Sequence, residues 1–507
     1  MSQQLPTGFI PVVPMNPAAR RTAVNWFTRP VFFVLVILPI AIAFGAADDH
    51  RTTALLAYLN CLVAGVAAMY FVRQRSLQAM IPVLFLTWQT MSWPIACTFF
   101  AIFAPDASYL TMHYVRHFLD GGERLQLALL VFMICYLLMC RWIIRKTPEL
   151  PAAPPANSRR MASLILAVVM VVIGLNAIGK VKELPFAVQY LADGLFIYLN
   201  GLMLVVGALL RQLPVRTILI TMVFLAFCGV FYALGNARGM ALLPFSLFVF
   251  GLLFHSTLTP RMKFNLVVAA AVSLPLYLAI ADSTRRLLGG IGFENLERRA
   301  EALSRGVTEF LDVNSVFVRS LGRLFSTGGH SIITLTPESR PYMDFSPQLY
   351  FTELFTRLLP GVIYYAPHYS WTTILTDYDI RITDKTSVEL STVGSFWILG
   401  GWTAVAIGGL ALGLTHALLA NLIAGAARRS YLKGLFYLAM VGPHVLWCQN
   451  LDYISHFRLL VYALIGAVLI YQLVLAPAIG SGAPQPLRAV AIAFPPRGGA
   501  AFGAPPR

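Results

Sequence analysis

Arginines stand at the ends of two apolar blocks of this sequence, where a cation has no obvious partner. Arg285 and Arg286 close the stretch IADSTRRLLGG, and Arg238 lies in GNARGMALLPF between two glycines. Guanidinium groups bind phosphate and carboxylate through paired hydrogen bonds. These arginines are therefore candidates for holding an anionic ligand. The alternatives are a salt bridge from the Arg285 and Arg286 pair to Asp282 or contact with lipid headgroups, and for Arg238 a simple anchor at the membrane interface.

Carboxylates gather in the most polar stretch of the chain, TDYDIRITDKTSVEL, which lies just before an apolar block. It contains Asp377 and Glu389 together with Arg381. A carboxylate in such a place can take a proton from an attacking hydroxyl while a guanidinium holds a phosphate leaving group. The stretch thus has the residue types for a group-transfer reaction at a membrane surface. A hydrated loop with internal ion pairs is the alternative interpretation.

The elements that must position these residues are membrane helices. The 507 residues are 58% hydrophobic and only 12% charged, which is too apolar for a water-soluble chain. The apolar residues come in blocks of the length that crosses about 30 Å of hydrocarbon as a helix. Twelve such blocks are predicted, at residues 30–47, 53–72, 80–104, 125–144, 161–179, 192–210, 217–235, 240–256, 264–281, 390–415, 433–448 and 459–478.

The basic residues predict how these spans are oriented. The net charge of +16 does not indicate nucleic acid, because the basic residues stand singly or in pairs at span ends and form no basic stripe. If the N-terminus is cytoplasmic, the inner segments hold 20 of the 38 Lys and Arg but only one of the 22 acidic residues, Glu149. The positive-inside rule is then obeyed, both termini are cytoplasmic, and the arginine pair after Asp282 lies outside, against the charge bias.

This orientation divides the chain into five parts. A cytoplasmic segment at 1–29 precedes spans 1–9 at 30–281, and a long periplasmic segment at 282–389 carries an amphipathic helix from Phe293 to Leu311. Spans 10–12 at 390–478 follow, and the tail at 479–507 is rich in Pro, Gly and Ala, which predicts disorder. The six cysteines fall within or at the edge of spans and indicate neither a disulfide framework nor a metal site.

The order of these features resembles the Wzy-type O-antigen polymerases, which join oligosaccharide repeat units in the bacterial inner membrane. The resemblance rests on NARG at a span mouth, the basic ending RMK of the next span, ADSTRR, the long outer segment, and the glycine-patterned span STVGSFWILGGWTAVAIGGLALG. Two patterns frequent in that family differ here, because Gly394 is followed by Ser395 rather than Glu, and the long segment reads LLPGVIYYAPH. The resemblance covers residues 217–415.

The resemblance implies an all-α polytopic membrane protein with about twelve transmembrane helices, similar in architecture to the GT-C glycosyltransferases. It implies a substrate, an undecaprenyl-diphosphate-linked oligosaccharide, and a chain-length regulator as a possible partner. Neither a cofactor nor a metal is expected, since the leaving group is already a good one. The implied diphosphate ligands are Arg238, Arg285, Arg286 and, more weakly, Arg381, and the implied bases are Glu389, Asp377 and His368 in that order.

Three further residues have weaker predicted roles. His330 is a possible base in the outer segment, and His456 and Arg458, in LDYISHFRLL, could line the same cavity or simply cap and snorkel at a span end.

Other functions stay open. A polyprenyl-phosphate-dependent glycosyltransferase would place acids in the first outer loop, where Asp48 and Asp49 lie; an O-antigen ligase differs mainly in its acceptor. A flippase or transporter is less expected because the chain has no internal repeat.

Overall fold

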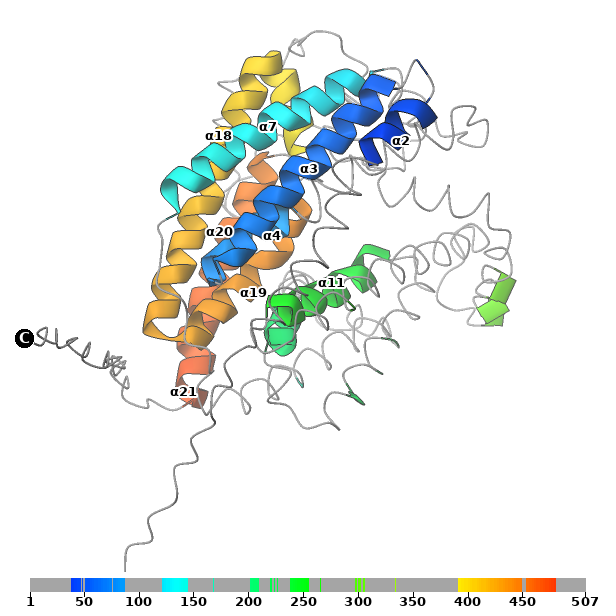
Figure 1. The fold of residues 1–507 in the computed structure, drawn as a ribbon. Helices are drawn as coiled ribbons and strands as arrows, with labels where there is room; N and C mark the ends of the chain where they lie inside the picture. Colours follow the sequence, from blue (N-terminus) through cyan, green and yellow to red (C-terminus); the bar gives the residue numbers. More distant parts are fainter. Residues whose placement is uncertain are drawn as a thin grey trace, which may run out of the picture.

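The structure is a computed structural model, and all of its described secondary structure is helical (Figure 1). It describes residues 38–46, 48, 51–74, 76–86, 121–144, 201–208, 238–254, 391–448 and 453–479, with isolated positions at 167, 219, 220, 223, 226, 265, 297, 298, 300, 301, 304, 305 and 333. No strand occurs among them. The prediction of an all-α fold is confirmed for this part of the chain.

Four described helices are long and apolar enough to cross a membrane. They are α3 (Arg51–Arg73), α7 (Gly122–Ile143), α18 (Thr392–Arg429) and α20 (Tyr453–Ile470), which π-helical residues extend. Their positions agree with the predicted spans at 53–72, 125–144, 390–415 and 459–478. The described part of the chain is therefore that of an all-α membrane protein, and the total of twelve spans stays a prediction.

The remaining described elements are shorter. In chain order they are α2 (Leu38–Gly45), η3 (Leu77–Ala79), α4 (Met80–Leu84), α11 (Arg238–Phe254), α19 (Tyr431–Trp447), the π-helix η8 (Tyr471–Leu475) and α21 (Ala476–Ile479). Residues 201–208 are also helical and pack between α11 and α19 through glycine: a Cβ on Gly207 or Gly251 would meet the other helix's backbone, and one on Gly201 would meet the carbonyl of Ala439. Small residues let these backbones approach closely.

Two helix ends differ from the sequence prediction. The span predicted to end at residue 415 continues as α18 to Arg429, and the last span begins at Tyr453 instead of residue 459. The extra turns of α18 keep a buried face that includes Ala420, Ile423 and Ala427, so packing continues well beyond the apolar block. The exposed face of these turns is also apolar, at Leu418 and Leu422, so the hydropathy of the chain does not fall at residue 415.

A glycine pair holds α7 against α18, the most extensive helix contact of the described fold (Figure 1). A Cβ on Gly409 would collide with the Phe132 carbonyl, and one on Gly413 would lie 2.7 Å from the Tyr136 carbonyl. Glycines four residues apart occupy one helix face and allow the backbones to touch. The Cys140 thiol also donates to the Gly413 carbonyl over 3.6 Å. The close contacts at Gly409 and Gly413 thus determine which part of α18 lies beside Tyr136 of α7.

A sharp bend divides α18 into two parts. Gly400 and Gly401 leave helical geometry, and Gly401 has a φ of 57°, in the left-handed region that glycine adopts without strain. The short first part folds back on the second, where the Phe396 ring fills the space that a side chain on Gly408 would need. The first part is packed inside the bundle, because every residue from Thr392 to Ile398 is buried.

The last two helices form an antiparallel pair. Lys433 near the start of α19 lies 5.3 Å from the centroid of the Tyr471 ring, which follows α20. The cation thus contacts an aromatic face near the end where Arg428 and Arg429 close α18. The opposite ends of α19 and α20, at Cys448 and Tyr453, are therefore at the end predicted to face the periplasm.

Candidate functional site

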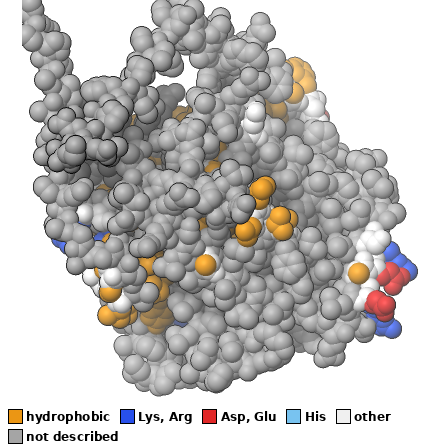
Figure 2. All heavy atoms as spheres, turned by 90° about the horizontal axis from the view of Figure 1, so that it is seen from below, with side chains coloured by type: hydrophobic (Ala, Val, Ile, Leu, Met, Phe, Trp, Pro, Cys, Tyr) orange, Lys and Arg blue, Asp and Glu red, His pale blue; other side chains and the backbone are white. Residues whose placement is uncertain are grey.

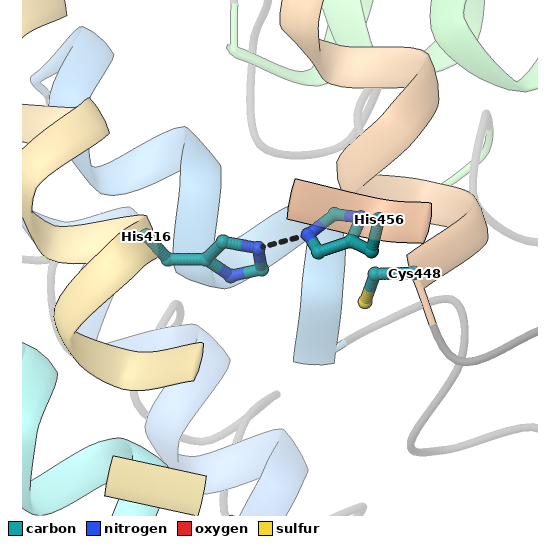
Figure 3. A group of neighbouring side chains, drawn as sticks. All are labelled: His416, Cys448 and His456. Carbon is teal, nitrogen blue, oxygen red and sulfur yellow. Dashed lines mark hydrogen bonds between the residues drawn. The ribbon is translucent and has the colours of Figure 1, made fainter. Parts of the chain in front are cut away.

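Three fully buried side chains from separate parts of the chain meet inside the bundle. His416 comes from the middle of α18, Cys448 follows α19, and His456 lies in the first turn of α20; each is 0% exposed. The Nε2 atoms of the two histidines are 3.0 Å apart, so one ring donates a hydrogen bond to the other. Figure 3 shows the two rings approaching each other beside the Cys448 sulfur. We call these three residues the His–Cys cluster.

Tyr136 of α7 completes a chain of hydrogen bonds. Its hydroxyl lies 3.0 Å from Nδ1 of His416, on the side of the ring opposite His456. The Phe85 ring packs against Tyr136 and His416 at centroid distances of 4.3 and 5.7 Å and excludes water from both. The close approach at Gly413 places Tyr136 within reach. A buried hydroxyl, two imidazoles and a thiol therefore share one apolar region.

The first turn of α18 borders the same region. The Thr392 hydroxyl donates to the Cys448 carbonyl over 2.6 Å, and Ser391 caps the helix by accepting from the amide of Gly394 at 2.9 Å. Both side chains are fully buried. The Cys448 backbone is thereby fixed to the start of α18 at Thr392, three residues after Glu389 in the sequence.

Tyr453 joins α20 to both parts of α18. Its hydroxyl lies 3.0 Å from the Thr415 hydroxyl, one residue before His416, and its ring lies 5.5 Å from that of Phe396. These contacts fix the first turn of α20, which carries His456. The position of the second imidazole is thus set by the packing around it.

Arg458 lies two residues beyond His456, within the membrane helix α20. Its side chain is half-buried, and its Nε atom is fully buried without a hydrogen-bond partner among the described residues. A guanidinium nitrogen inside an apolar bundle is costly unless a carbonyl or an anion pairs with it. Arg458 is therefore a candidate ligand for an anion, on a different side of α20 from His456, because side chains two residues apart do not share a helix face.

The structure describes three of the predicted site residues. Arg238 is the first residue of α11, an apolar helix of 17 residues. His456 and Arg458 lie in α20, as above. The other predictions fall outside the described residues, so their arrangement stays a prediction: they are Arg285, Arg286, His330, His368, Asp377, Arg381 and Glu389.

The sequence analysis missed the contact of His416 and Cys448 with His456. Cys448 was expected to have no part in a metal site, yet its sulfur and one nitrogen of each histidine all lie within 4.8 Å of one another, close enough to share an ion. Their spacing matches no short metal-binding motif, because each comes from a different element. The available signal was three polar residues inside apolar spans, which mark function more often than packing.

Comparisons of the chain with known protein families, curated proteins and solved structures found no match.

Two kinds of chemistry are open to the arrangement. Neutral imidazoles linked to a phenol can pass a proton from one ring to the next. Two imidazole nitrogens and a thiolate can also ligate a transition metal. Both require residues held in fixed positions, which the contacts of Thr392, Thr415 and Tyr136 provide.

Proposed function

We propose that the protein is a polymerase that joins undecaprenyl-diphosphate-linked oligosaccharide repeat units at the periplasmic face of the bacterial inner membrane. The product is a surface polysaccharide or exopolysaccharide. The proposal combines the resemblance of residues 217–415 to the Wzy-type polymerases with the charge pattern, and it is supported by the polar interior of the bundle.

The observation that carries the proposal is Arg458. Its guanidinium lies in a membrane helix with a buried Nε that has no partner among the described residues. A diphosphate at the end of a polyprenyl chain supplies an anion at the membrane surface while its lipid stays in the bilayer. Arg458 is thus a further candidate ligand beside the predicted Arg238, Arg285 and Arg286, and all four lie at span ends predicted to face the periplasm.

Contacts of the long outer segment with the bundle support the same location. Ile333, three residues after His330, is fully buried, and its carbonyl accepts from Arg124 near the start of α7 over 3.3 Å. That end of α7 is also predicted to be periplasmic. The segment returns to the bundle at Ser391, where the next residue bonds to the Cys448 carbonyl. The proposed base Glu389 immediately precedes this point.

The proposed reaction needs only a base and cations. The hydroxyl of the acceptor repeat attacks the anomeric carbon of the donor, a new glycosidic bond forms, and the bond from that carbon to the diphosphate oxygen breaks. The proton of the hydroxyl goes to a carboxylate, for which Glu389 is proposed first, then Asp377, then His368. Arginines stabilise the negative charge that develops on the departing undecaprenyl diphosphate.

The first outer loop argues against a polyprenyl-phosphate-dependent glycosyltransferase that builds its site there. Only five residues separate Gly45 at the end of α2 from Arg51 at the start of α3. Asp48 in this loop forms an exposed ion pair with Arg51 at 2.6 Å. The acid thus has a local partner, and the loop is too short for a helix. An O-antigen ligase remains the second candidate, since it uses the same donor.

The test is the size distribution of lipid-linked and surface glycan in a strain lacking the protein. We expect single repeats, lipid-linked or attached to lipid A, with no longer chains above them, and restoration of long chains by the wild-type protein. Long lipid-linked chains left untransferred would identify a ligase instead. A repeat missing one sugar would identify a glycosyltransferase, and an unchanged ladder would contradict all three.

A further inference from the structure

We infer that the His–Cys cluster is a metal site, which binds one d¹⁰ transition-metal ion, Zn²⁺ or Cu⁺, between α18, α19 and α20. His416, Cys448 and His456 supply two imidazole nitrogens and a thiolate. This site is independent of the proposed polymerase reaction, in which no metal takes part.

The distances in the cluster are close to those of a ligand shell. Zinc ligands of the imidazole type lie about 2.0–2.1 Å from the ion, which places two such nitrogens about 3.3 Å apart in a tetrahedron. The Nε2 atoms of His416 and His456 are 3.0 Å apart, and all three ligand atoms lie within 4.8 Å of one another. Binding thus requires the two rings to part slightly and the sulfur to approach, without rearrangement of the helices.

The surroundings of His416 include the hydrogen-bond partner that a metal-ligating histidine needs. When Nε2 binds an ion, Nδ1 carries a proton and must donate it to an acceptor. The Tyr136 hydroxyl is at 3.0 Å from that nitrogen and can accept this bond. The Phe85 ring packs against His416 and Tyr136 and limits their rotation. The tautomer of His416 and the orientation of its ring are therefore set in advance.

The two ring nitrogens of His456 differ in their surroundings: Nε2 faces His416, whereas Nδ1 does not bond within the cluster. Its ring is fully buried, and its Nδ1 atom has no hydrogen-bond partner among the described residues. Buried polar atoms are nearly always paired, so an unpaired imidazole nitrogen in a packed interior calls for an explanation. The cluster as it stands uses only half of the hydrogen-bonding capacity of this ring. An ion at Nε2 leaves a proton on Nδ1 of His456, for which the described residues supply no acceptor, in contrast to Nδ1 of His416.

The ligand types select the class of ion. Thiolate and imidazole together favour Zn²⁺ and Cu⁺ over Mg²⁺ or Ca²⁺, which prefer oxygen. One thiolate makes the complex neutral with Cu⁺, which suits a buried site, whereas Zn²⁺ leaves one positive charge and an open coordination position for water or an anion. The two ions therefore differ in their need for a fourth ligand. The three residues of the cluster do not supply one.

The experiment measures metal binding by the full-length protein purified in detergent. Metal-stripped protein is titrated with Co²⁺ as a spectroscopic substitute for Zn²⁺, and separately with Cu⁺ against a chromogenic chelator. We expect one ion per chain, and for Co²⁺ a thiolate-to-metal charge-transfer band. Displacement of Co²⁺ by Zn²⁺ identifies a zinc site; retention of Cu⁺ against the chelator, with weak Co²⁺ binding, identifies a copper site.

Matched variants connect the binding to these residues. Cys448→Ser should remove the charge-transfer band and His416→Gln should reduce binding to background, whereas Cys140→Ser, which changes a buried cysteine outside the cluster, should keep one ion per chain. Tyr136→Phe should weaken affinity by about 10- to 100-fold. Cys448→His keeps a ligand and should bind Co²⁺ without the thiolate band, which distinguishes lost ligation from misfolding.

Two results would overturn the inference. One is wild-type protein that elutes as a single species and binds neither Co²⁺, Zn²⁺ nor Cu⁺ above the level of His416→Gln. The other is an ion whose stoichiometry and spectrum are unchanged in Cys448→Ser. Glycan chain length is not a readout here, so the failure of the polymerase proposal would leave this result unaffected.

Discussion

The interior of the bundle and the exposed helical residues Glu301 and Arg305 satisfy polar groups in opposite ways. In the bundle, Tyr136, His416 and His456 lie on three different helices and bond to one another in full burial. At 297–305, Glu301 and Arg305 stand one turn apart and form a 2.6 Å ion pair with side chains 60% and 66% exposed. Figure 2 shows red and blue side chains together at the edge of the face it draws. The first arrangement depends on tertiary packing and the second on local spacing.

This difference determines how much each arrangement contributes to stability. A buried polar atom that loses its partner costs about 1–3 kcal/mol, while an exposed ion pair contributes about 0–1 kcal/mol and is screened by salt. The buried arrangement also depends on the backbone approach of α7 to α18. The loss in free energy of unfolding should therefore be largest for a substitution at the glycine contact, smaller at the buried hydrogen bond and smallest at the exposed pair.

The largest effect is expected at the contact of α7 with α18. Gly413→Leu places a branched side chain where even a Cβ would lie 2.7 Å from the Tyr136 carbonyl. The helices must separate, which costs about 3 kcal/mol or more and breaks the bond between Tyr136 and His416. Thermal unfolding of the purified protein in detergent should show a strongly lowered midpoint.

The control for this variant is Gly425→Leu, on the same helix. No atom lies within 4 Å of a Cβ built on Gly425, so the substitution should leave the midpoint within a degree or two of the wild type. Equal destabilisation by both variants would mean that leucine disturbs α18 through the helix itself, and the close contact would lose its assigned role.

A smaller effect is expected at the buried hydrogen bond. Tyr136→Phe keeps the ring packing against Phe85 but leaves Nδ1 of His416 without its partner. We expect a loss of about 1–3 kcal/mol in the free energy of unfolding. Tyr70→Phe is the comparison, because Tyr70 is 45% exposed. Removing its hydroxyl should therefore cost little. A destabilisation no larger than that of Tyr70→Phe would show that the bond does not contribute.

The smallest effect is expected at the exposed pair. Arg305→Ala should change the free energy of unfolding by about 0.5 kcal/mol or less, and the change should shrink further in high salt. Denaturation in 0.05 and 0.5 M NaCl measures both. A loss above 1 kcal/mol that salt does not reduce would mean that this surface is covered by another part of the protein.

The same contrast explains what the sequence could predict. The helical conformation of Glu301 and Arg305 and their exposed charges were predicted from spacing alone, although Ala300, expected on the apolar face, is exposed. The long spans followed from hydropathy, because length and apolar content are local properties. The end of α18 at Arg429 did not, since its last turns are held by packing on other helices.

The candidate site was predictable only in part. His456 and Arg458 were recognised because a polar residue in an apolar span is visible in the sequence. Their neighbours were not, because His416 is 40 residues from His456 and reaches it only through the fold of α18 and α20. The glycine pattern of the re-entering span was noticed, but its use, to bring Tyr136 to His416, depends on which helix packs there.

The most direct measurement for the proposed function is glycan chain length with Arg458→Gln. The variant, expressed in the deletion strain at wild-type membrane levels, removes a half-buried cation worth about 1.5–3 kcal/mol in charge-assisted bonds to a diphosphate, so polymerisation should slow by roughly 10- to 150-fold. The account predicts single repeats with Arg458→Gln, partial recovery with Arg458→Lys, and full chains with Arg305→Gln. Wild-type chain lengths from Arg458→Gln would contradict it.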